Sequence, residues 1–380
     1  MLRAINFTYP IFYMQDEHRG YALRPNTEGW FRKEGQSYVR INSEGLRDRE
    51  HSKLKPANTV RIAVIGDSFA EAMHVPQEDS FWSVMEKRLQ PCTRFGGRQV
   101  EVINFGVSGY GTAQELITLR QKTWEYSPDI VLLAVTTLND FIDNSRALKT
   151  SNDIPYFVLR DGNLVLDDSF KETPVFRSKW SSRNSSWNRL GRWLRQNLRV
   201  VQLLHQTQAQ IKNLLDQRRQ QQRTPQPLPG QQSPQRTGEA DPDYLMFSEP
   251  NDPQVKEAWE VTDKLIVQMR DEVQSRGAKF LVVTLSYGIQ VHPDAKARQD
   301  FLQRVGGTDI FYPDKRINAL GERASFTVLN LAPDLQRYAE EHRTFLHGFG
   351  KDLGGGHWNA FGHRQAGEII AQRLCSEPGN

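Results

Sequence analysis

The sequence predicts an α/β protein with three layers, in which a central parallel sheet lies between two layers of helices. Short apolar runs rich in β-branched residues alternate with segments whose apolar residues recur at helical spacing. Strands separated by helices run parallel, because a parallel connection needs a crossover long enough to hold a helix. One long segment without this alternation, residues 142–252, predicts an insertion into the α/β domain.

The predicted strands are five apolar runs, at residues 62–65, 100–105, 129–135, 279–285 and 326–330. The predicted helices occupy residues 79–90, 112–124, 255–275, 313–323, 335–341 and 364–374. Ligands of open α/β sheets bind at the carboxyl ends of the strands. We therefore expect the functional residues on the loops that follow the strands.

Two segments flank or interrupt this α/β domain, which we assign to residues 61–380. Residues 1–60 lack a long helical pattern and predict a β-rich lead-in that covers part of the core, with a strand near 37–41. Within the insertion, an Asp-Gly-Asn turn at 161–163 joins two apolar runs and predicts a β-hairpin.

The rest of the insertion predicts a long basic helix at 186–219 and a disordered linker at 220–243, which is rich in Gln, Pro, Gly and Arg. Residues 183–223 hold nine Arg or Lys and one acidic residue, Asp216. We favour a helix that packs on the core with a solvated basic face. The alternative is peripheral contact with an anionic membrane surface.

Composition excludes several classes of protein. A net charge of +4 over 380 residues is too small to indicate nucleic-acid binding, and a mean hydropathy of −0.63 predicts a soluble chain. No apolar run is long enough to span a membrane, and the first fourteen residues lack the pattern of a secretory signal. Association with the cell envelope stays open.

Cysteine usage and loop sequences predict no metal and no cofactor. Cys92 and Cys375 lie far apart and show neither metal spacing nor a disulfide framework, so they indicate no compartment. No nucleotide-binding loop is present in the sequence.

Four loops carry a candidate constellation. Ser68 lies in Gly-Asp-Ser-Phe after the first strand, and Gly109 lies in Asn-Phe-Gly-Val-Ser-Gly after the second. Asn139 lies in Leu-Asn-Asp after the third, and His357 lies in Gly-His-Trp-Asn-Ala-Phe-Gly-His before the final helix. Taken singly, Gly109 fits a tight turn and Asn139 an Asx turn. In this order and context the four blocks resemble the SGNH (GDSL-type) hydrolase family, over roughly 61–141 and 255–374.

The resemblance implies a flavodoxin-like α/β/α fold and a serine nucleophile, Ser68, with His357 as its base. A serine hydroxyl attacks poorly until an imidazole takes its proton. The family's oxyanion hole would correspond here to the backbone N–H groups of Ser68 and Gly109 and the side chain of Asn139. Such donors stabilise the negative charge of a tetrahedral intermediate.

One departure concerns the third member of the triad. The family places an aspartate three residues before the histidine, and this chain has Gly354 there. The nearest preceding carboxylate is Asp352, and the intervening glycines could let it fold back onto His357. We hypothesise that Asp352 orients His357; the alternative is a Ser–His dyad whose ring is oriented by a backbone carbonyl.

These residues predict a serine hydrolase that cleaves an O-acyl ester, acetyl in the first instance, on a small molecule or a carbohydrate. A carbohydrate O-acetyltransferase is the closest alternative, because both reactions can share one acyl-enzyme. A non-catalytic binding protein on the same fold is the alternative from another class, and the missing aspartate is its best support.

Overall fold

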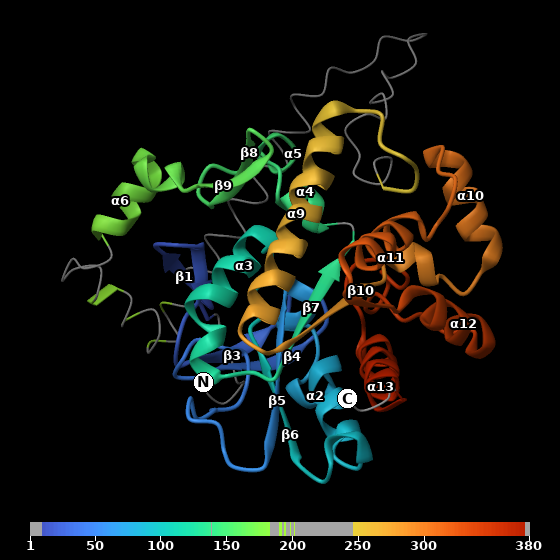
Figure 1. Ribbon diagram of the computed structural model, residues 1–380, viewed down its shortest axis with the longest axis horizontal. Helices are drawn as coiled ribbons and strands as arrows, with labels where there is room; N and C mark the ends of the chain where they lie inside the picture. Colours follow the sequence, from blue (N-terminus) through green and yellow to red (C-terminus); the bar gives the residue numbers. More distant parts are fainter. Residues whose placement is uncertain are drawn as a thin grey trace.

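The centre of the computed structural model is a five-stranded parallel sheet in the order β11-β10-β7-β5-β6 (Figure 1). The structure describes residues 10–137, 139–182 and 246–376, together with residues 190, 191, 194, 198 and 201. The five strands are β5 (Thr59–Gly66), β6 (Gln99–Asn104), β7 (Ile130–Thr136), β10 (Lys279–Leu285) and β11 (Thr327–Asn330).

This strand order is that of the flavodoxin-like doubly wound fold. In sequence order the strands lie as 2-1-3-4-5, so the direction of winding reverses between β5 and its neighbours β6 and β7. The sheet confirms the predicted fold class, and the ends of all five predicted strands are found within three residues of their predicted positions. The point of reversal lies at the carboxyl end of β5, directly before Ser68.

Helices cover both faces of the sheet. One face packs against α3 (Thr112–Gln121), α9 (Pro253–Ser275) and α11 (Tyr312–Ala324), through a core that includes Trp259. The other packs against α2 (Phe81–Leu89), α12 (Ala332–His342) and α13 (Ala360–Ser376). Strand residues alternate between the two cores, so residues 62–65 of β5 are apolar and buried on both faces.

The helices predicted for the α/β domain are all found, and the structure adds others that the sequence analysis did not predict. All six predicted helices are present, but α10 (Ala295–Val305), which carries Arg298 and Phe301 inward, was not predicted. Four further helices are α1 (Ser68–Glu71), α4 (Asn139–Asp143) and, within the insertion, α5 (Arg146–Lys149) and α6 (Pro174–Ser182). The 3-10 turns lie at 77–79, 93–95, 123–126, 169–172 and 288–291.

The N-terminal segment forms two antiparallel hairpins. The first pairs β1 (Tyr13–Asp16) with β2 (Gly20–Leu23), and the second pairs β3 (Thr27–Phe31) with β4 (Ser37–Ile41). The sequence indicated only the last of these strands. A third hairpin, β8 (Tyr156–Arg160) with β9 (Asn163–Asp167), has the predicted Asp-Gly-Asn turn.

Part of the insertion lies outside the described residues. This applies to the predicted linker at 220–243 and to nearly all of the predicted basic helix at 186–219, so its contact with a core or a membrane stays a prediction. Among the helices that are described, none is both long and apolar enough to cross a membrane.

The two cysteines, which the sequence left unpaired, form a disulfide bond. Cys92, just before the 3-10 turn at 93–95, bonds Cys375 in the last turn of α13, with a Cα–Cα distance of 5.8 Å. Their sequence separation of 283 hid this pairing, because only the packing of α13 against α2 brings the two chain segments together.

Candidate active site

Ser68 occupies the turn between the first sheet strand and a short helix. β5 ends at Gly66, and the Asp67 carboxylate accepts a hydrogen bond from the Phe69 N–H at 2.9 Å, which makes Asp67 the N-cap of α1. Ser68 is therefore the first helical residue, and only 6% of its surface is exposed.

Two glycines let the neighbouring elements close around this turn. A Cβ on Gly106 would lie 2.5 Å from Cβ of Ala70, and one on Gly66 would lie 3.0 Å from the same atom. Only glycine permits so close an approach of backbone to helix. The loop after β6 therefore passes directly against α1 and carries Gly109 to the same edge of the sheet as Ser68.

The structure brings His357 to Ser68. Nε2 of His357 lies 2.8 Å from Oγ of Ser68, although the two residues are 289 positions apart. The ring packs against Phe69, with centroids 4.9 Å apart, and this contact limits its rotation. The sequence placed these two residues on separate loops, and the geometry joins them by a hydrogen bond.

Glu34 holds the other side of the His357 ring. Its Oε2 lies 2.6 Å from Nδ1 of His357, and its Oε1 accepts the backbone N–H of the same histidine at 2.7 Å. A carboxylate only accepts, so Nδ1 carries the proton and Nε2 is left to accept from the Ser68 hydroxyl. The three side chains form a continuous hydrogen-bonded chain.

The electrostatics keep Glu34 ionised. Burial by itself raises the pKa of this carboxyl, but the hydrogen bonds from the ring and the backbone of His357 outweigh it and lower the pKa to about 2. Glu34 is therefore negatively charged at neutral pH and accepts the Nδ1–H of His357 as a carboxylate.

The predicted role of Asp352 is corrected by this contact. Asp352 is exposed, and Nδ1 of His357 is already engaged by Glu34. The glycines do fold this loop, but they bring the Asp352 backbone toward Gly348 rather than its carboxylate toward the ring. A dyad oriented by a backbone carbonyl is excluded for the same reason.

Glu34 was missed because it lies 323 residues from His357, in the turn between β3 and β4. Lys-Glu-Gly at 33–35 looks like an ordinary exposed turn in the sequence. The one available signal was indirect: a triad that lacks its aspartate needs a carboxylate from elsewhere.

A second layer of contacts fixes the loop that carries His357. Nδ1 of His347 lies 2.8 Å from the carbonyl oxygen of Gly356, and its Nε2 lies 3.0 Å from Oγ of Ser286. The same hydroxyl accepts a hydrogen bond from the Trp358 indole at 2.9 Å. His347, Ser286 and Trp358 are all buried, so the residues on both sides of His357 are anchored in the core.

His74 completes the surroundings of the ring. It stacks on His357 with centroids 3.9 Å apart and planes 19° apart, and its Nε2 lies 3.7 Å from Oε2 of Glu34. Burial, followed by the charge of His357, lowers the pKa of His74 to about 3. His74 is therefore a neutral, flat surface against His357 at neutral pH.

In the described part of the chain, one group of side chains has ligand atoms close enough together to hold a metal ion: Glu34, His74 and His357. Their geometry does not favour one. Nitrogen lone pairs lie in the ring planes, and the near-parallel rings of His74 and His357 do not direct theirs to a common point. Both nitrogens of His357 are also engaged already, by Ser68 and Glu34.

The three predicted oxyanion donors have different surroundings. Gly109 adopts a φ of +76°, which favours glycine, and the amide of Asn139 donates to Asp67 Oδ2 at 3.3 Å. Within the described residues, the backbone N–H groups of Ser68 and Gly109 have no acceptor. Two unpaired N–H groups on neighbouring loops are what an oxyanion hole requires.

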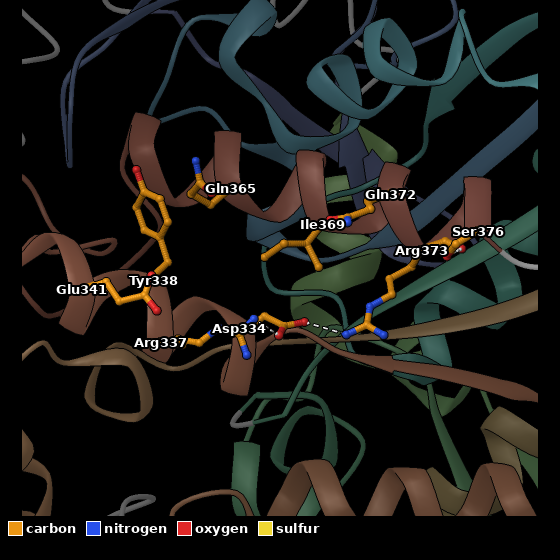
Figure 2. A pocket seen from close by; sticks show the side chains of 9 residues that line it. All are labelled: Asp334, Arg337, Tyr338, Glu341, Gln365, Ile369, Gln372, Arg373 and Ser376. Atoms are coloured by element: carbon orange, nitrogen blue, oxygen red, sulfur yellow. Dashed lines mark hydrogen bonds and ion pairs between the residues drawn. The ribbon is translucent and has the colours of Figure 1, made fainter.

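A separate groove lies between α12 and α13 (Figure 2). Two of its arginines bind one carboxylate, since Asp334 accepts from Arg337 at 2.6 Å and from Arg373 at 3.0 Å. The groove holds none of the predicted site residues.

Comparison with known proteins identifies distant likenesses among solved structures. An acetylxylan esterase from Geobacillus stearothermophilus is 9% identical, with 87% of this chain and 99% of that chain covered and a TM-score of 0.39. The acetyl xylan esterase AlAXEase is 12% identical, with 83% and 98% covered and a TM-score of 0.39. TesA is 12% identical, with 84% and 99% covered and a TM-score of 0.36.

No family model matches the sequence, and no curated protein does. Structural likenesses this distant identify neither the substrate nor the roles of residues. Those assignments rest on the geometry of this chain's own side chains.

The contact between Gly356 and Glu34 can be tested by adding one methyl group. A Cβ on Gly356 would lie 2.2 Å from Oε1 of Glu34, so we expect Gly356→Ala to displace the carboxylate. Reaction of Ser68 with a fluorophosphonate should slow about 10²-fold, the typical cost of a misplaced reacting group. The measurement is the labelling rate.

Gly350→Ala is the matched control for this variant. Gly350 lies on the same loop with a similar φ, +61° against +65°, but an added Cβ would meet nothing within 4 Å. Both variants carry the same backbone strain, and only Gly356→Ala pushes on Glu34. Equal labelling rates in the two variants would contradict the assignment of Glu34.

Proposed function

We propose that this chain is a serine esterase in which Ser68 is the nucleophile, His357 the base and Glu34 the carboxylate that orients the base. The observation that carries the proposal is the continuous chain of short contacts, 2.6 Å from Glu34 to His357 and 2.8 Å from His357 to Ser68. This arrangement is recognised by geometry and roles, and a glutamate can serve as its acid.

The geometry supports a two-step reaction. As the Ser68 Oγ attacks the carbonyl carbon of the ester, its proton passes to Nε2 of His357. The tetrahedral oxyanion accepts hydrogen bonds from the N–H groups of Ser68 and Gly109 and from the Asn139 amide. His357 then gives the proton to the departing alkoxide, and the acyl group stays on Ser68. Glu34 stabilises the imidazolium that exists between these proton transfers.

Water attacks the acyl-enzyme in the second step. His357 again takes a proton, now from water, and returns it to Oγ as the carboxylic acid leaves, which then ionises in solution. A sugar hydroxyl in place of water would make the same site an acetyltransferase. We propose hydrolysis of an O-acyl ester, with acetyl esters of carbohydrates as the first substrates to screen.

The alternative of a non-catalytic binding protein depended on the missing aspartate. Glu34 supplies a carboxylate at the position where that aspartate would act. Its low pKa, the unpaired N–H groups and the Ser68–His357 hydrogen bond all favour catalysis over binding alone.

The first test is hydrolysis of p-nitrophenyl acetate by the wild type and by Ser68→Ala. We expect kcat to fall by about 10⁴-fold or more in the variant, since removal of a nucleophile leaves only the oxyanion hole and binding. Turnover that is equal in both proteins would contradict the proposal. Wild-type turnover with an acetylated sugar, followed by assays with added sugar acceptors, then separates hydrolysis from transfer.

The role of Glu34 has its own test. Glu34→Gln keeps the shape but removes the charge that holds Nδ1–H, so kcat should fall by about 10²–10⁴-fold. Asp352→Asn is the matched control, because Asp352 is exposed and its variant should keep wild-type kcat. A loss in Asp352→Asn with none in Glu34→Gln would reverse the assignment.

A further inference from the structure

The peptide group between Ser108 and Gly109 is bound on its carbonyl side and free on its N–H side among the described residues. Its N–H, on Gly109, is one of the proposed oxyanion donors and has no acceptor among the described residues. Its carbonyl oxygen, on Ser108, accepts a hydrogen bond from the hydroxyl of Tyr21 at 2.8 Å. Tyr21 belongs to β2 of the first N-terminal hairpin, 87 residues before Ser108 and outside the α/β domain.

Aromatic contacts fix Tyr21 in this position. Its ring meets Tyr13 and Tyr110 edge-on, with centroids 6.1 Å and 5.4 Å away, and the Tyr110 hydroxyl donates to the Tyr21 carbonyl at 2.5 Å. A Cβ on Gly109 would lie 2.7 Å from the Tyr21 hydroxyl oxygen. Position 109 therefore requires glycine for two reasons: the close approach of Tyr21 and the positive φ.

The Tyr21 hydroxyl keeps its proton under all ordinary conditions. Burial, followed by the charge of Tyr110, raises the pKa of Tyr21 far above its usual value. The hydroxyl is therefore a permanent donor to the Ser108 carbonyl.

The next peptide group of the loop, between Gly109 and Tyr110, is also bound by a side chain. Nζ of Lys149, at the end of α5, donates to the Gly109 carbonyl at 2.6 Å and pairs with Asp143 at 3.1 Å. Both peptide groups that flank Gly109 thus have their carbonyls bound by side chains. Their planes are fixed before any substrate arrives.

We propose that Tyr21 is a positioning residue of the oxyanion hole, which orients and polarises the Ser108–Gly109 peptide so that the Gly109 N–H is aimed at the developing oxyanion. A hydrogen bond to an amide carbonyl draws electron density toward oxygen and makes the N–H of the same amide a stronger donor. This inference rests on the proposed esterase function, because it assigns a role in that reaction.

Tyr21→Phe tests the inference by removing one oxygen. We expect kcat per active site to fall about 3–10-fold, as for a typical neutral hydrogen bond, with KM unchanged because the contact acts on the transition state. Active sites are counted by fluorophosphonate labelling of Ser68. The affinity for a boronic acid, which forms a tetrahedral adduct on serine, should fall by the same factor as kcat.

Tyr110→Phe is the matched control. It also removes one hydroxyl that joins this hairpin to the loop after β6, but that hydroxyl binds the Tyr21 backbone and not the Ser108–Gly109 peptide. Its kcat and boronic-acid affinity should stay near wild type, and thermal unfolding reports any loss of hairpin docking in either variant.

The outcomes separate this inference from the function on which it rests. Unchanged kcat in Tyr21→Phe, or equal losses in both tyrosine variants, would overturn the role of Tyr21 and leave the esterase intact. Wild-type turnover that does not depend on Ser68 would contradict the proposed function and this inference with it. Tyr21→Phe that unfolds while Tyr110→Phe stays folded would show a purely structural role and overturn the inference.

Discussion

The contact between Glu34 and His357 is the constraint on which the rest of the site depends. Two hydrogen bonds, to the ring and to the backbone of the histidine, fix both the tautomer and the plane of the imidazole. Hydrogen bonds to a charged group are worth about 1.5–3 kcal/mol each. A side chain at position 356 would block the approach of this carboxylate, and Gly356 has none. The orientation that Glu34 gives the ring is kept by contacts with His74 and Phe69 and by the anchored loop behind His357.

The N-terminal hairpins belong to the site although they lie outside the central sheet (Figure 1). The turn of the second hairpin carries Glu34, and a strand of the first carries Tyr21, whose hydroxyl binds the loop of Gly109. The doubly wound sheet positions Ser68, Gly109 and Asn139 by topology alone, because all three follow parallel strands that end at one edge. The orientation of His357 and of the oxyanion loop comes from chain segments that the sheet does not specify.

The sequence predicted what local patterns determine. Apolar runs and helical spacing identified all five sheet strands, and the turn after the first strand identified Ser68. His357 was identified by its block before the final helix. Glu34 and the Cys92–Cys375 disulfide were missed for a common reason: each joins segments about 300 residues apart, and neither has a local pattern that marks its partner. The helix α10 was missed because it buries only three residues, Arg298, Phe301 and Val305, and one of them is charged, so it lacks a clear apolar pattern at helical spacing.

The most direct test of the Glu34–His357 contact is a proton NMR spectrum of the resting protein, without substrate. A carboxylate that accepts from Nδ1–H of a histidine deshields that proton strongly and slows its exchange with water. We expect a far-downfield resonance in the wild type and in Asp352→Asn, and none in Glu34→Gln. A resonance that persists in Glu34→Gln, or that disappears in Asp352→Asn, would contradict the account.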